Sequence, residues 1–149
     1  MSYDLMVFES TVAPRDRKAF MAWYDQQTEW SESHGYNDPT VCSPQLRAWF
    51  FEMIETFPAM NGPHASDDDD DNEKLTDYSL GKDVIYSCFS WSQVDPAFQH
   101  MVALAKKHGA GFFDVSADDG AIVFPGEFDG FSKFTGTASQ DKKPWWRFW

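Results

Sequence analysis

The sequence has few cysteines, few basic residues and no long apolar run. Its two cysteines, Cys42 and Cys88, do not make the disulfide framework that small secreted domains use. The opening segment MSYDLMVFES lacks the basic and apolar regions of a secretory signal. No apolar stretch approaches the length of about 18 residues that spans a bilayer. We therefore expect a cytoplasmic protein.

Sequence motifs that identify common enzymes are also missing. There is no G-x-S-x-G, no G-x-x-x-x-G-K-[ST] phosphate loop and no G-x-G-x-x-G dinucleotide fingerprint. The histidines form no metal-ligand spacing with their neighbours; they are His34, His64, His100 and His108. We expect no catalytic residue, no metal and no cofactor.

A catalytic site can still be assembled in space from distant residues. One alternative is a small hydrolase or transferase that uses Cys42, His34 and Asp38. Cys42 precedes a predicted helix, where the helix dipole favours a thiolate. Cys88 lies in an apolar segment and is predicted to be a core residue.

Basic residues are outnumbered, because 24 acidic side chains face 12 lysines and arginines and give a net charge of −12. Residues 61–77 alone carry seven acidic side chains against Lys74. Such a field repels nucleic acid and anionic membranes and attracts a basic protein. Solubility alone is the other interpretation of the charge.

The acidic excess is concentrated in the predicted loop 59–77, which contains five consecutive aspartates: Asp67, Asp68, Asp69, Asp70 and Asp71. Like charges in a row repel one another, so we expect a solvated, mobile segment. The alternatives are a surface for a basic partner and a Ca²⁺ or Mg²⁺ site. The metal alternative is weakened by the contiguous spacing, which lacks the D-x-D-x-D-G pattern.

The chain is rich in core-forming residues, 42% hydrophobic and 17% aromatic over 149 residues, which suits one domain. In Tyr3–Phe8 the apolar side chains fall on both faces, so this strand should be covered on both sides. Further strands are predicted from β-forming residues and turn signals at Tyr78–Leu80, Val84–Trp91, Phe112–Val115 and Ala121–Phe124. Val84–Trp91 is the candidate for the central strand.

Three helices are predicted from apolar periodicity and start signals. The first opens at Pro14 and carries aromatic residues up to Trp30. The second has Ser43 as N-cap, and its apolar face runs from Leu46 to Phe57 before Pro58. The third starts at Asp95–Pro96 and ends before Gly109, with Lys106, Lys107 and His108 in its last turn.

This order predicts the α+β class, with a mixed or antiparallel sheet of about four or five strands and helices packed on one face. A ferredoxin-like variant is one option. We expect a single domain over 1–125. Residues 126–149 should be a flexible segment with an aromatic tip that includes Trp145, Trp146 and Trp149. Exposing so many aromatic side chains is costly, so the tip should fold back, dock on another chain or touch a membrane; the net charge argues against the membrane.

Several short segments carry a resemblance. They are Ser2–Tyr3–Asp4–Leu5 followed by Val7, Phe57–Pro58, Ile85–Tyr86, Trp91–Ser92, His108–Gly109 and Phe113–Asp114. Their order is similar to that of a loose family of small uncharacterised bacterial proteins that begin "SYDL", over about residues 2–125. The ending from Lys143 to Trp149 resembles the tails of small bacterial proteins, some of which look like immunity proteins of toxin systems. The resemblance implies no catalytic residues.

Together these features predict an immunity-type inhibitor that binds a basic toxin domain in the cytoplasm, because acidic inhibitors associate quickly with basic targets. The candidate contact residues are aromatic or acidic: Trp30, Tyr36, Asp38, Asp67 to Asp71, Trp145, Trp146 and Trp149. We expect neither nucleic acid nor a membrane as partner. The alternatives are a structural or regulatory homo-oligomer and the small enzyme near Cys42 and His34.

Overall fold

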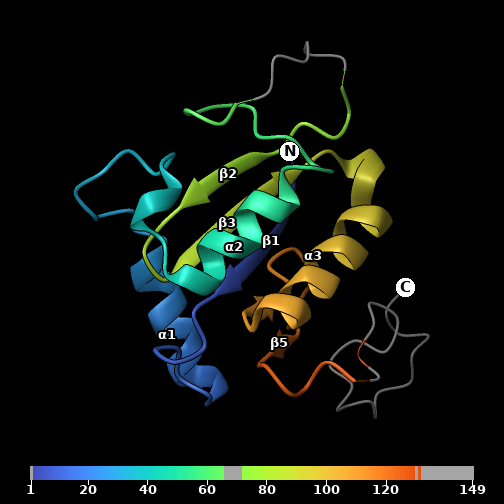
Figure 1. The fold of residues 1–149 in the computed structure, drawn as a ribbon. Coiled ribbons are helices and arrows are strands. Elements are labelled where there is room, and N and C mark those ends of the chain that lie inside the picture. Colours follow the sequence, from blue (N-terminus) through green and yellow to red (C-terminus); the bar gives the residue numbers. More distant parts are fainter. Residues whose placement is uncertain (1, 66–71, 130, 132–149) are drawn as a thin grey trace.

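A five-stranded antiparallel sheet lies at the centre of the computed structural model, which describes residues 2–65, 72–129 and 131 (Figure 1). The strands are β1 (Tyr3–Phe8), β2 (Asp77–Leu80), β3 (Val84–Phe89), β4 (Gly111–Phe113) and β5 (Ile122–Val123). The helices are α1 (Arg17–Gln27), α2 (Pro44–Met53) and α3 (Val94–His108), with short 3-10 helices η1 (Pro39–Val41) and η2 (Trp91–Gln93).

The strand order is β2-β3-β1-β4-β5, and every pair of neighbouring strands is antiparallel. The predicted α+β class is confirmed, and the option of a mixed sheet is wrong. β3 lies between β1 and β2, and β1 lies between β3 and β4. With α2 and α3 as the crossover helices, the first four strands have the split β-α-β connectivity of ferredoxin-like domains. β1 is therefore the middle strand, the place that the sequence assigned to β3.

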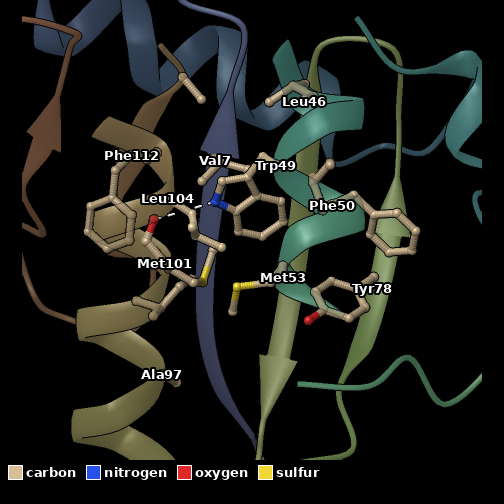
Figure 2. Close-up of a cluster of buried hydrophobic side chains, with 14 of the residues drawn as sticks. Val7, Leu46, Trp49, Phe50, Met53, Tyr78, Ala97, Met101, Leu104 and Phe112 are labelled. Carbon is tan, nitrogen blue, oxygen red and sulfur yellow. Dashed lines mark hydrogen bonds between the residues drawn. The ribbon is translucent and has the colours of Figure 1, made fainter. Parts of the chain in front are cut away.

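α2 and α3 cover one face of the sheet, as Figure 2 shows. Ser43 accepts a hydrogen bond from the Leu46 amide at 3.4 Å and Pro44 follows it, so the predicted helix start is confirmed. Trp49 is wedged between the two helices, and its indole Nε1–H donates to the Met101 carbonyl at 3.4 Å (Figure 2). The Trp49 side chain is fully buried, and this hydrogen bond satisfies its one polar atom.

α1 covers the other face, so the expectation that all helices share one face is wrong. Phe20 is fully buried there, with its ring 5.0 Å from Phe8 and 5.3 Å from Phe113. The sequence predicted this second layer indirectly, because Met6 and Phe8 needed cover on the face opposite Leu5 and Val7. Antiparallel sheets often leave one face in water, whereas here a short helix covers part of it.

Element ends differ from the predicted ones where a capping residue competes. α1 begins at Arg17 and not at Pro14, because the Asp16 side chain accepts from the Ala19 amide at 3.0 Å. Trp30 lies beyond the helix, with φ of 54°. α2 ends at Met53, and Phe57 is buried through the turn that follows.

α3 begins at Val94, with Gln93 as N-cap and no side-chain cap, so the predicted cap at Asp95 is wrong. Its C-cap Gly109, with φ of 75°, is confirmed. Phe128, which the sequence placed after the domain, is buried in the core, and Phe131 packs near Phe98. Residues 130 and 132–149 of the expected flexible segment lie outside the described residues.

Trp49 gives a test of this packing, with Trp91 as the matched control because its side chain is 49% exposed. We predict that Trp49→Ala lowers the free energy of unfolding by about 3–5 kcal/mol, while Trp91→Ala lowers it by about 1 kcal/mol or less. Urea unfolding followed by circular dichroism measures both. Equal losses in the two variants would contradict the core position of Trp49.

Candidate functional site

Carboxylates gather at the end of the sheet where β1 and β2 begin. The register places Asp4 opposite Cys88 and Cys88 opposite Asp77, so the three residues form one row across β1, β3 and β2. Tyr3 and Leu5 belong to the cluster under α2 and α3, so Asp4 faces the other side of the sheet. All three residues of the row are partly exposed. Tyr24 of α1 reaches this part of the face, because burial and then the charges of Asp4 and Cys88 contribute to the raised pKa of its hydroxyl.

Asp4 is held in place by hydrogen bonds on both carboxylate oxygens. Ser2 Oγ donates to Oδ1 at 2.5 Å, and the Tyr86 hydroxyl donates to Oδ2 at 2.6 Å. The turn after β4 is tied to the same residue, because Ser116 N donates to the Asp4 carbonyl and Asp4 N donates to Ser116 Oγ. That turn carries Asp118 and Asp119, both exposed.

Trp91 stands at the same end of the sheet. Ser90 closes β3 by accepting a hydrogen bond from the Ser92 amide at 3.4 Å, which starts η2 and turns the chain away from the strand line. The indole of Trp91 packs on the ring of Tyr3 with centroids 5.2 Å apart. Tyr3 is 4% exposed and belongs to the middle strand, so Trp91 has a rigid support.

Two further carboxylates lie around Tyr3. Burial raises the pKa of the Tyr3 hydroxyl well above its usual value, and the charges of Asp114 and Asp95 add to this rise. Asp95 is exposed in the first turn of α3, and Asp114 is buried at the end of β4. We call this region the acidic end: Trp91 with Asp4, Asp77, Asp95, Asp114, Asp118 and Asp119.

The aromatic residues predicted as contacts lie together elsewhere. The rings of Trp30 and Tyr36 are 5.1 Å apart, and Trp30 also packs on Tyr86. The Tyr36 carbonyl accepts from the Leu80 amide, at the opposite end of β2 from Asp77. The structure therefore brings Trp30 and Tyr36 together but separates them from the acidic end along β2.

Glu32 holds this loop to the sheet. Its Oε1 lies 2.5 Å from His34 Nε2 and accepts from the Lys82 amide at 3.1 Å. Asp38, also predicted as a contact, is the N-cap of η1 and accepts from the Thr40 amide and hydroxyl, which lower the pKa of its carboxyl group. Its carboxylate is thus engaged in local capping.

The remaining predicted contacts, Asp67 to Asp71 and Trp145, Trp146 and Trp149, lie outside the described residues. The chain on either side of the aspartate run can be placed. Ala59 bridges to both Ala65 and Thr76, and Thr76 directly precedes β2. Both attachments of the run therefore lie next to Asp77, at the acidic end (Figure 1).

The alternative site at Cys42 is not assembled as a nucleophile and base. Cys42 is 3% exposed, and burial raises the pKa of its thiol to about 12, so the predicted preference for a thiolate is wrong. His34 uses both ring nitrogens elsewhere, since Nδ1 accepts from the Tyr36 amide at 3.1 Å and Nε2 contacts Glu32. Desolvation of the thiol outweighs the helix dipole here.

The prediction that Cys88 is a core residue is also wrong, because Cys88 is half-buried on the face away from α2 and α3. Burial and then the charge of Asp4 raise the pKa of its thiol to about 12. Within the described ranges, no group of three or more His, Cys, Asp or Glu side chains is placed to hold a metal ion.

Sequence reasoning missed Trp91, Asp4, Asp77 and Asp95 as candidates. A signal for Asp4 was present, since it is the one charged residue in an otherwise apolar two-sided strand and so marks where cover ends. β-forming residues run up to Trp91 and predict a strand that includes it. The Ser90 cap of η2 ends the strand before Trp91.

None of the described helices is long and apolar enough to cross a membrane. Comparison of the chain with protein-family models, with curated proteins and with solved structures gave no match.

The raised pKa of Cys42 predicts slow thiol labelling. In a Cys88→Ser variant at pH 8, iodoacetamide should alkylate Cys42 on the order of a thousandfold more slowly in the folded than in the urea-unfolded protein, because only the thiolate reacts. The rate in the folded protein should rise about tenfold per pH unit over the alkaline range. Mass spectrometry gives both rates. Equal rates in the two states would contradict the burial of this thiol.

Proposed function

We propose that this chain is an immunity-type inhibitor that binds a basic bacterial toxin domain through its acidic end. The observation that carries the proposal is that Trp91, half-exposed on a rigid support, lies at the same end of the sheet as carboxylates from four different elements. The resemblance to immunity proteins supplies the class of partner. The acidic end supplies the chemistry that would recognise it.

The negative charge of the acidic end would speed the association of such a partner. Carboxylates that gather on one surface attract a basic protein and accelerate association. Exposed ion pairs contribute only about 0–1 kcal/mol each, so charge alone gives a fast but weak complex. The described chain that leads into the Asp67–Asp71 run also reaches this surface, because Ala59 bridges to both Ala65 and Thr76, next to Asp77.

Trp91 would supply the binding affinity that the exposed carboxylates of the acidic end do not supply by themselves. Tryptophan is enriched among the residues that dominate binding energy at interfaces. The packing of Trp91 on buried Tyr3 restrains the indole before binding, which reduces the entropy lost on association.

The edges of the sheet support binding through this surface and not through strand addition. Thr76 donates to the Pro58 carbonyl just before β2, and Leu80 donates to the Tyr36 carbonyl at its end. Loops thus occupy the outer edge of β2 at both ends, and the other edge strand, β5, has two residues. Such short, covered edges oppose pairing with another chain.

We predict that the tagged full chain retains one basic protein from its native cells at low salt, and loses most of it at high salt because charge pairs are screened. Asp77→Asn/Asp95→Asn/Asp118→Asn should weaken retention about tenfold or more. The matched control Asp25→Asn/Glu29→Gln/Asp129→Asn changes the net charge equally at exposed positions elsewhere and should stay within about twofold.

Trp91→Ala should also weaken retention about tenfold or more. Recovery of the chain alone under both salt conditions, or equal losses from the two triple variants, would overturn the proposal. If Trp30→Ala weakened retention of the partner and Trp91→Ala did not, the binding surface would lie at the loop of Trp30 and Tyr36, which the sequence predicted.

A further inference from the structure

We propose that Trp91, Tyr3 and Asp95 form a seat for one cationic group, a guanidinium or ammonium. This deepens the proposed function and rests on it for the statement that the group is an arginine or lysine side chain of the basic partner. The seat itself is argued from the residues of this chain.

The aromatic half of the seat is the indole of Trp91. Tryptophan is the best aromatic partner for a cation, and such contacts gain strength when partly desolvated. In the described part of the chain, the cation–aromatic contacts are Arg15 over Phe124 and Lys74 over Phe57. Lys74 also donates to Gln93 at 3.2 Å. The face of Trp91 therefore carries no cation from within these residues.

The hydroxyl of Tyr3 is the second, independent observation. Its oxygen is buried and has no hydrogen-bond partner, a condition that costs about 1–3 kcal/mol. It belongs to the ring on which Trp91 packs, and it lies within electrostatic reach of Asp114 and Asp95. A hydroxyl oxygen accepts hydrogen bonds, so an N–H of a bound cation would satisfy it.

The sign of the local charge selects a cation over an anion. The N-terminus of α3 has no side-chain cap and carries the equivalent of about half a positive charge. The exposed carboxylate of Asp95 in the first turn of this helix opposes it with a full negative charge. The field at the seat is therefore negative, and an arginine or lysine side chain that contacts Trp91 gains from the Asp95 carboxylate.

The test uses the ¹⁵N-labelled full chain and no protein partner. The indole N–H signal of Trp91 is assigned by its loss in Trp91→Phe. We predict that N-acetyl-L-arginine amide shifts this signal saturably, with a Kd of about 1–10 mM. The neutral isostere N-acetyl-L-citrulline amide should give less than about a tenth of the shift. N-acetyl-L-lysine amide distinguishes ammonium from guanidinium, and binding of either supports the seat.

Variants separate the parts of the seat. Asp95→Asn should weaken arginine amide binding about fivefold, and Tyr3→Phe, which keeps the ring, about threefold. Asp25→Asn, an exposed acid on α1, should leave it unchanged. Absence of a saturable Trp91 shift, or equal shifts from arginine and citrulline amides, would overturn the seat.

The two proposals fail separately. If the chain retains a partner through Trp91 but arginine amide does not bind, the cation seat is wrong and the anchor packs on apolar surface. If arginine amide binds but the chain is recovered alone from cells, the seat stands and the inhibitor function is wrong.

Discussion

β1 is buried on both faces and hydrogen-bonded along both edges, and the arrangement of the other elements follows from this. Its residues Leu5 to Phe8 are all fully buried. α2 and α3 must cover Leu5 and Val7, and α1 must cover Met6 and Phe8. Each side chain of this size gains about 1.5–3 kcal/mol when it leaves water, so the strand cannot form without both layers.

The second layer is a single short helix, and it meets the acidic end through one side chain. α1 has 11 residues and is about 16 Å long. Its aromatic residues pack on Phe8 and Phe113, and Tyr24 interacts with Tyr86, Asp4 and Cys88. Asp4, Cys88 and Asp77 stay partly exposed, so this row is suited to polar residues, which can be solvated as well as hydrogen-bonded.

Local signals predicted most of the fold. The alternation in Tyr3–Phe8, the Ser43–Pro44 start of α2 and the glycine stop of α3 agree with the structure because each depends on neighbours within a few residues. The errors arose where two local signals competed: Asp16 against Pro14, and the Ser90 cap against the β-forming run that ends at Trp91.

The candidate site was less predictable than the fold, because it depends on register. Asp4 and Asp77 are 73 positions apart in sequence and become neighbours of Cys88 only through the pairing of β1 and β2 with β3. Composition gave the sign of the charge. It could not show that Trp91 would pack on Tyr3, since that contact requires β1 to lie in the middle of the sheet.

The partly buried pair Trp30 and Tyr36 and the exposed Trp91 differ in what the fold gains from them. Trp30 and Tyr36 have φ values of 54° and 62°, a conformation that is costly for such residues. The Glu32 hydrogen bonds hold this loop, and in return the Tyr36 carbonyl covers the edge of β2 at Leu80. The pair thus protects the sheet. Trp91 closes no edge, and half of its surface is in water. One part of the indole packs on Tyr3, and the exposed part is what the proposed basic partner would cover.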